Sequence, residues 1–207
     1  PPSTPSTIDV VSASTEERLG RVPEAMEDDV DAAVGAAYRA FAAPHGWAQG
    51  PVEERAAAME RLADAVAARG EETARHVSAQ TGMPITTARR HEAVLPALVL
   101  RFYARTLRAT ALQEDRDGLL GGPVRVSRSP VGVVAAVLPS TLPQSLAATT
   151  LGPALAAGCT VVLRPSPETV LDAQLFAEAV DEAAGGHLDV VVPDDGVLRE
   201  VAEQPAT

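Results

Sequence analysis

Two short polar segments follow apolar stretches in the second half of the chain, and both carry side chains suited to binding a nucleotide. Leu138-Pro139-Ser140-Thr141 follows the first apolar stretch, and Arg164-Pro165-Ser166-Pro167-Glu168 follows the second. In a parallel sheet covered by helices, ligands bind beyond the carboxyl ends of the strands. An arginine placed there can neutralise a phosphate, and a serine with a nearby glutamate can hold the hydroxyls of a ribose. The same residues could instead cap the helix that follows, so both interpretations stay open here.

Other motifs with known chemistry are absent from the sequence. It has no G-x-G-x-x-G fingerprint, no P-loop and no H-E-x-x-H motif, and no cluster of cysteine and histidine indicates a metal. The scattered histidines are predicted to be surface residues: His45, His76, His91 and His187. A Ser-His-Asp triad needs only to meet in space, so the sequence does not exclude one.

Composition is typical of a soluble globular protein. Of the 207 residues, 46% are apolar, and 17 basic residues stand against 28 acidic ones for a formal charge of −11. This balance disfavours nucleic acid and an anionic membrane surface as partners, because both need a basic face. Cys159 is the one cysteine, no stretch approaches the roughly 20 apolar residues of a membrane span, and the first residues do not read as a signal peptide. We therefore expect a cytoplasmic protein.

The elements that position the polar segments follow from the hydrophobic pattern. Residues 1–7, rich in Pro, Ser and Thr, are predicted to be a disordered lead-in, and Ile8–Ser12 and Arg18–Val22 a hairpin. Helical spacing then predicts helices over Glu27–Ala43, Val52–Arg69, Glu71–Thr81 and Ile85–Thr106. Pro96 should kink or split the last of these.

The pattern changes after residue 110. Gln113–Gly122 is polar and predicted to be a loop, and Val124–Arg128 alternates as a strand does. Continuous apolar stretches predict buried parallel strands over Val131–Leu138, Thr160–Leu163 and Leu188–Val192. Between them lie the predicted helices Gln144–Ala157, interrupted near Gly152-Pro153, and Thr169–Ala184, whose Thr169 and Asp172 approximate a capping box. The predicted fold class is α/β, a helical N-terminal portion plus an incomplete doubly wound, Rossmann-like parallel sheet.

Within this layout, the segment Ala154-Leu-Ala-Ala-Gly-Cys-Thr-Val-Val-Leu-Arg-Pro-Ser-Pro-Glu-Thr169 resembles one in the NAD(P)-dependent aldehyde dehydrogenases. The family's segment reads Ala-Leu-Ala-Ala-Gly-Asn-Thr-Val-Val-Leu-Lys-Pro-Ser-Pro-Glu-Thr. Val131–Leu138 with Pro139 and Pro143 looks like the family's strand that ends in Pro-Trp-Asn-Phe-Pro. Upstream, the family's order is kept by Glu27-Asp-Asp-Val, Trp47, Arg55, Leu62 and Thr81-Gly-Met-Pro84. The resemblance covers about residues 8–207 and the family's N-terminal, cofactor-binding part.

This resemblance implies a fold that holds NAD or NADP against the strand ends. Val137, Leu138 and Pro139 would line the nicotinamide–ribose side through backbone and apolar contacts. Arg164 stands where the family's lysine reaches the adenosine ribose, with Ser166 and Glu168 beside that ribose. The acidic residue that some members use there aligns with Pro167, so we expect weak binding or a preference for NADP.

Several positions depart from the family pattern. Thr141 replaces the asparagine whose amide stabilises the oxyanion, and Ser140 replaces the tryptophan beside it. Losing such a donor typically costs on the order of a hundredfold in rate. Cys159 replaces an asparagine and is predicted to be a small packing residue. The family's catalytic cysteine and general-base glutamate would fall beyond Thr207, so we expect the chain to be inactive alone.

Two main hypotheses follow. In the first, the chain is the NAD(P)-binding half of an aldehyde-oxidising oxidoreductase. In the second, it is a non-catalytic assembly module that docks a second copy or a partner chain through its open sheet edge and Val124–Arg128, which falls in the family's oligomerisation arm. An unrelated Rossmann-type binding protein is a third alternative. We expect residues 8–128 to hold the hairpin, helices and arm strand and residues 129–207 the partial NAD(P)-binding βαβ segment, together as one domain.

Overall fold

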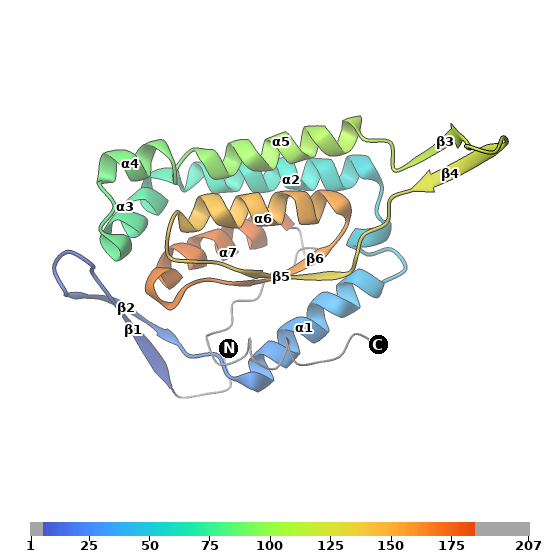
Figure 1. The fold of residues 1–207 in the computed structure, drawn as a ribbon. Coiled ribbons are helices and arrows are strands. Elements are labelled where there is room, and N and C mark those ends of the chain that lie inside the picture. The colour runs from blue at the N-terminus through green and yellow to red at the C-terminus, as the bar shows by residue number, and fades with distance from the viewer. Residues whose placement is uncertain (1–5, 185–207) are drawn as a thin grey trace.

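A parallel two-stranded sheet lies between helices at the centre of the fold (Figure 1). The structure is a computed structural model that describes residues 6–184. In it β5 (Val133–Val137) pairs with β6 (Thr160–Arg164), in register from Val133 opposite Thr160 onward. Helix α6 (Pro143–Ala157) connects the strands and packs on one face of the sheet, and α1 (Glu27–Ala42) packs on the other. This β–α–β arrangement confirms the predicted α/β fold class.

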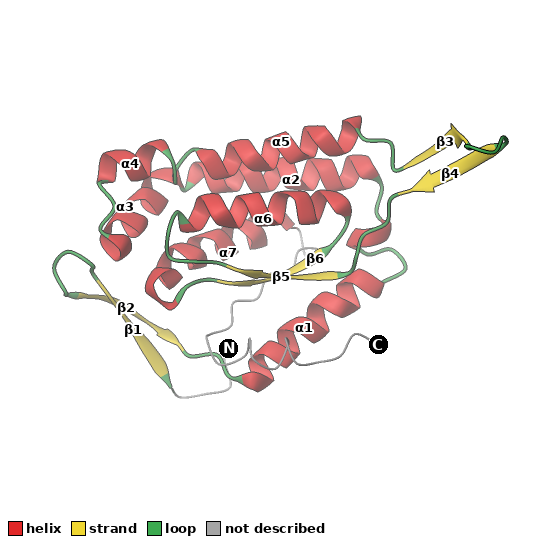
Figure 2. Cartoon of the chain, viewed as in Figure 1, coloured by secondary structure: helices red, strands yellow, loops and turns green. Residues whose placement is uncertain are grey.

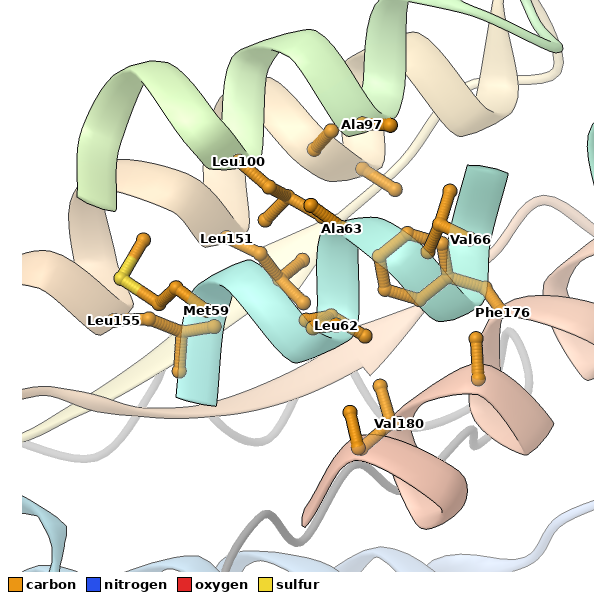
Figure 3. Packing of buried hydrophobic residues seen from close by; sticks show 14 of the residues in the cluster. Met59, Leu62, Ala63, Val66, Ala97, Leu100, Leu151, Leu155, Phe176 and Val180 are labelled. Atoms are coloured by element: carbon orange, nitrogen blue, oxygen red, sulfur yellow. The ribbon is translucent and has the colours of Figure 1, made fainter. Parts of the chain in front are cut away.

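Helices α2 (Val52–Ala68), α5 (Leu95–Ala109), α6 and α7 (Val170–Ala184) build the main hydrophobic core with the sheet. The predicted apolar stripe of α2 faces this core, where Met59 and Leu62 meet Leu100, Leu151 and Phe176 (Figure 3). The first four of these side chains are fully buried. Burial of each such side chain contributes roughly 2 kcal/mol to the free energy of folding. Many buried aliphatic side chains therefore make up for the small number of aromatic ones.

Pro96 splits the long predicted helix in two. Helix α3 (Gly70–Thr81) is followed by α4 (Ile85–Arg90), and the chain turns before α5 begins at Leu95. Pro96 lies in the first turn of α5, where its missing N–H has no partner to lose. The prediction of a kink or a split is therefore confirmed as a split.

Two antiparallel hairpins flank the helices. β1 (Thr7–Val11) pairs with β2 (Arg18–Pro23), so the predicted hairpin is confirmed and begins at Thr7, one residue earlier than expected. β3 (Gln113–Asp117) pairs with β4 (Pro123–Ser127) and extends away from the helical body (Figure 2).

The prediction of a loop over Gln113–Gly122 is wrong for its first half. The strand β3 consists wholly of polar residues and is largely exposed, so it lacks the apolar alternation that marks a strand. Backbone pairing and a cross-strand ion pair stabilise it instead, with Arg125 Nε 2.9 Å from Asp115 Oδ1.

The predicted interruption of α6 at Gly152-Pro153 is also wrong, because the helix runs through both residues. Pro153 removes one helical hydrogen bond, but Leu151 and Leu155 on either side pack into the core and hold the helix in place. Gly152 has a packing reason, since a Cβ there would lie 2.6 Å from Cδ2 of Tyr103. Gly152 therefore serves the close contact between α5 and α6.

Burial differs between the two central strands. β6 is buried over its first four residues, as predicted, whereas β5 is only partly covered and Val137 is exposed. Within residues 6–184, β5 pairs with a neighbour on one edge only, which leaves its other edge open. The predicted third strand, Leu188–Val192, lies outside the described residues.

Candidate functional site

The carboxyl ends of β5 and β6 lie side by side, and both polar segments leave the sheet at this edge. Val137 is opposite Arg164 in the parallel register. One residue further on, the backbone N–H of Leu138 donates to the carbonyl oxygen of Arg164 at 2.9 Å. The structure therefore brings the two polar segments together at one edge of the sheet.

The three residues at the end of β5 differ in what they can offer a ligand. Val137 is 45% exposed and Pro139 is also exposed, whereas Leu138 is 6% exposed and belongs to the main core. This alternation follows from the two-residue period of a strand. Val137 and Pro139 can thus make side-chain contacts, and Leu138 can offer only its backbone.

A serine, a glutamate and an arginine form a polar group beyond β6. The buried Ser166 donates its hydroxyl hydrogen to the carboxylate of Glu168. This hydrogen bond is the main cause that lowers the pKa of Glu168, and a backbone hydrogen bond and the charge of Arg164 act in the same direction. Glu168 is exposed. The segment therefore presents an ionised carboxylate near a cation.

The loop between β5 and α6 places Thr141 at the same edge of the sheet. Thr141 is exposed, and Ser140 beside it is half-buried. The next residue, Leu142, has a left-handed backbone with φ 50° and ψ 51° and forms the N-cap of α6. A left-handed conformation costs a residue other than glycine roughly 1–2 kcal/mol. The backbone strain thus lies next to the residue that stands at the family's oxyanion position.

A buried glutamate closes the first turn of α6. Glu92, in the turn between α4 and α5, is 1% exposed. Its carboxylate accepts from the N–H of Gln144 at 2.9 Å, from the N–H of Ser145 at 3.3 Å and from the Ser145 hydroxyl. Helix N-termini commonly use such N–H groups to bind phosphate. Because Glu92 takes these donors, α6 does not present them to a dinucleotide.

A second buried carboxylate lies between two glutamine side chains. Asp172, in the first turn of α7, accepts from Gln80 Nε2 at 3.0 Å and from Gln144 Nε2 at 2.8 Å. Burial raises the pKa of Asp172 to about 7, and the charge of Glu92 adds to this effect, while the glutamine hydrogen bonds oppose it. The predicted capping box of Thr169 and Asp172 is therefore wrong. Instead, a 3₁₀ turn over Pro167–Thr169 leads into α7.

Sequence reasoning missed Gln80, Glu92, Gln144 and Asp172 as a connected group. Their hydrogen bonds join residues between 28 and 92 positions apart in the sequence, so no local motif predicts these contacts. One signal was present, since Asp172 lies at helical spacing from the buried Leu175, Phe176 and Ala179. A carboxylate within such an apolar stripe indicates a buried partner.

Cys159 lies away from this edge. It is 2% exposed and precedes β6, so it sits at the amino end of the strand whose carboxyl end carries Arg164. Within residues 6–184, no group of three or more His, Cys, Asp and Glu side chains could hold a metal ion. Over the same residues, no helix combines the length and the apolar character needed to cross a membrane.

Known proteins are similar to this chain in sequence. The model of the aldehyde dehydrogenase family matches residues 1–206. The chain is 39% identical over 206 residues to a geranial dehydrogenase of Castellaniella defragrans, an alignment that covers 99% of this chain and 43% of that protein. It is 33% identical to 2-aminomuconic semialdehyde dehydrogenase of Mus musculus, over 86% of this chain and 36% of that protein.

Solved structures share the fold. An NAD-dependent aldehyde dehydrogenase from Sinorhizobium meliloti has a TM-score of 0.89 and 36% identity, over 99% of this chain and 41% of that one. A variant of aldehyde dehydrogenase C from Pseudomonas syringae, in complex with NAD+ and octanal, has a TM-score of 0.85 and 35% identity over 93% of this chain and 39% of that one. The chain thus spans about two fifths of the length of these relatives. Because the family model matches almost its whole length and the fold agrees, the chain belongs to the aldehyde dehydrogenase family.

Proposed function

We propose that this chain is the NAD(P)+-binding part of an enzyme that oxidises an aldehyde. Family membership supports the proposal, as does the presence of NAD+ in solved relatives. The observation that carries it is the pairing of Val137 with Arg164 at one sheet edge, with the ionised Glu168 close behind. A dinucleotide needs apolar surface for its rings, a cation for its phosphates and an acceptor for its ribose hydroxyls, and this edge offers all three.

Each residue has its own part in this proposal. Glu168 accepts hydrogen bonds from ribose hydroxyls while Ser166 holds its carboxylate, and Arg164 neutralises a phosphate. Val137 and Pro139 pack against the nicotinamide side, and Leu138 contributes its backbone. Bound NAD(P)+ supplies the acceptor for the hydride of the aldehyde.

Thr141 is proposed to donate a hydrogen bond to the aldehyde oxygen as negative charge develops there. Its hydroxyl is exposed on the loop that leaves β5. A threonine hydroxyl reaches less far than an asparagine amide, so this donor is the weaker of the two.

The nucleophile and the general base are proposed to come from outside residues 6–184. Cys159 is buried at the wrong end of β6 for a site at the carboxyl edge. A nucleophile must reach the reacting carbon, and a buried thiol at the far end of a strand does not. We therefore expect the chain alone to bind the cofactor without turning over an aldehyde.

An apolar aldehyde is the proposed substrate class. Among the similar proteins, one is a geranial dehydrogenase and another was solved with octanal. On this chain, Val94, Leu95 and Leu98 are between 38% and 53% exposed, just beyond Glu92, which binds the first turn of α6. In the complete enzyme, kcat/KM should be higher for octanal than for succinic semialdehyde, whose carboxylate gains nothing from an apolar surface. A higher value for succinic semialdehyde would contradict this substrate class.

Isothermal titration of the intact protein with NAD+ and with NADP+ tests the cofactor proposal. Binding of at least one dinucleotide is expected, and Arg164→Gln should weaken it on the order of tenfold by removing a phosphate contact. Arg105→Gln, an exposed arginine on α5, is the matched control and should leave binding unchanged. No heat from either dinucleotide at millimolar concentration would refute the proposal.

Assembly through the β3–β4 hairpin is a second proposed function. The turn of this hairpin carries Leu119 and Leu120, which are 102% and 99% exposed, and Val124 on β4 is 50% exposed. Apolar side chains on a projecting hairpin with free strand edges favour pairing with another chain. The proposed partner is a second copy of this chain.

A further inference from the structure

The buried cluster of Gln80, Gln144 and Asp172 joins α3 to the starts of the two helices that follow the loops with the expected cofactor residues. Gln144 is the second residue of α6, three positions after Thr141. Asp172 is the third residue of α7, four positions after Glu168. Both helices therefore begin at the edge of the sheet where the candidate site lies.

Gln144 links the starts of the two helices directly. Its Nε2 donates to the backbone oxygen of Asp172 at 2.6 Å and to Oδ2 of the same residue at 2.8 Å. Its own backbone N–H donates to the carboxylate of Glu92 at 2.9 Å. A single side chain thus ties the first turn of α6 to the first turn of α7.

Gln80 holds the start of α7 from the opposite side. Its Nε2 donates to Oδ1 of Asp172 at 3.0 Å and to the backbone oxygen of His76 at 3.2 Å. Its Oε1 accepts from the backbone N–H of Leu171 at 2.9 Å. Because both ends of this amide are engaged, Gln80 fixes α7 against α3.

Burial makes this arrangement specific. Gln80 and Gln144 are each 3% exposed and Asp172 is 0% exposed, so water does not replace a lost partner. A buried polar group without a partner is costly, and these groups are all satisfied only when α3, α6 and α7 keep their present spacing. Glu92 is a second buried carboxyl group, and its charge acts on Asp172. Networks of this kind contribute more to a unique geometry than to net stability.

We propose that Gln80, Gln144 and Asp172 form a positioning cluster for the cofactor site. The cluster fixes the spacing between the 139–142 loop and the 165–169 segment, and through this spacing it sets the affinity for the dinucleotide. The effect of the cluster on affinity rests on the cofactor-binding function proposed above. Its effect on the spacing of the two segments does not depend on that function.

Hydrogen–deuterium exchange of the intact protein tests the cluster. Gln80→Met and Gln144→Met keep side-chain length and remove the amide, and Gln174→Met on the exposed face of α7 is the matched control. In both cluster variants, the hydrogen-bonded amides of Ser145 and Leu146 in the first turn of α6, and of Thr169 just before α7, should exchange on the order of tenfold faster, with residues 59–66 and 97–104 of the core unchanged. Gln80→Met is decisive because Gln80 bonds to α7 and not to α6, so its effect must pass through the cluster to reach Ser145 and Leu146.

Unchanged exchange of Ser145 and Leu146 in Gln80→Met would overturn the proposal. If Gln80→Met also loosens the core, Gln80→Glu replaces it, because this isosteric change keeps the acceptor for Leu171 and puts a carboxyl oxygen in place of the amide nitrogen that donates to Asp172 and His76. Dinucleotide affinity should fall on the order of tenfold in the cluster variants. If the wild type binds a dinucleotide and the cluster variants bind it equally well, the cluster does not set the affinity. If the wild type binds neither dinucleotide, the proposed cofactor-binding function is refuted, and hydrogen exchange alone tests whether the cluster fixes the spacing of the two segments.

Discussion

Glu168 keeps its charge because Ser166 donates to its carboxylate and Arg164 lies near it. Its charge therefore acts on any second anion brought to this edge, and the 2′-phosphate of NADP+ is such an anion. We expect Glu168→Gln to shift the ratio of affinities toward NADP+ by roughly tenfold, since a like charge at close range near a surface is worth about 1 kcal/mol or more. Titration with both dinucleotides measures the ratio. The exposed control Glu178→Gln should keep the wild-type ratio. The same unchanged ratio in Glu168→Gln would contradict a role of the Glu168 charge in cofactor choice.

Glu92 contributes to stability as the carboxylate that closes α6. Its three acceptor contacts satisfy N–H groups that the helix itself leaves without partners. We expect Glu92→Gln to lower the free energy of unfolding by about 1–2 kcal/mol, because a neutral amide accepts fewer of these bonds and loses the attraction to the helix dipole. Urea denaturation measures the loss. Glu72→Gln, an exposed acidic residue in the first turn of α3, should change it far less.

Individual residues were predictable from the sequence where the local pattern decided their surroundings. Val137 and Arg164 met at one edge because parallel strands bring their carboxyl ends together, and Cys159 was buried as a packing residue. The partner of Asp172 was not predictable, because Gln80 lies on another helix 92 positions away. Side chains that satisfy a buried charge are chosen by the packed fold rather than by neighbours in the chain.

At the scale of elements, hydrophobic periodicity located the helices and the central strands to within a few residues. It failed at β3, whose residues are all polar, since a strand exposed on both faces has no apolar alternation to detect. It also failed at α6, where local rules for Gly152-Pro153 predicted a break. Packing of the helix between α5 and the sheet overrides the loss of one hydrogen bond.

The junction of α3, α6 and α7 should make stability depend on pH. The pKa of Asp172 is about 7 in the fold, against about 4 in an unfolded chain. Folding therefore favours the protonated form, so its contribution to stability is fully present below about pH 4 and is lost as the pH rises to about 7. In Asp172→Asn this loss should be absent. The difference in unfolding free energy between wild type and variant should fall by about 1.4 kcal/mol per pH unit between pH 5 and 7 and then level off.

Chemical denaturation of both proteins at a series of pH values measures this difference. Other carboxylates, such as Glu71 with a pKa of about 2, titrate in both proteins and cancel in the comparison. A difference that stays constant from pH 5 to 8 would show that Asp172 does not titrate in this range.

At the scale of the whole molecule, the candidate cofactor edge and the edge of β5 that has no paired strand within residues 6–184 are both surfaces of the parallel sheet. The chain spans about two fifths of the length of its relatives, so much of the fold that surrounds such an edge in them lies outside this sequence. The family was predictable because the segment from Ala154 to Thr169 resembles the family's own segment, and the fold class was predictable because buried apolar strands alternate with helices. The substrate and the mode of assembly were harder to predict from the sequence, since they depend on contacts with other segments or chains.

The β3–β4 hairpin provides the last prediction. If it joins two copies of the chain, removing its apolar tip should lower the mass in solution. The double substitution Leu119→Ser and Leu120→Ser changes side chains that are fully exposed, so it should leave the fold intact while it weakens association at least tenfold. Light scattering coupled to size exclusion measures the mass over a range of concentrations. Leu19→Ser, an exposed leucine on the other hairpin, should keep the wild-type mass, and equal masses for all three proteins would place the contact elsewhere.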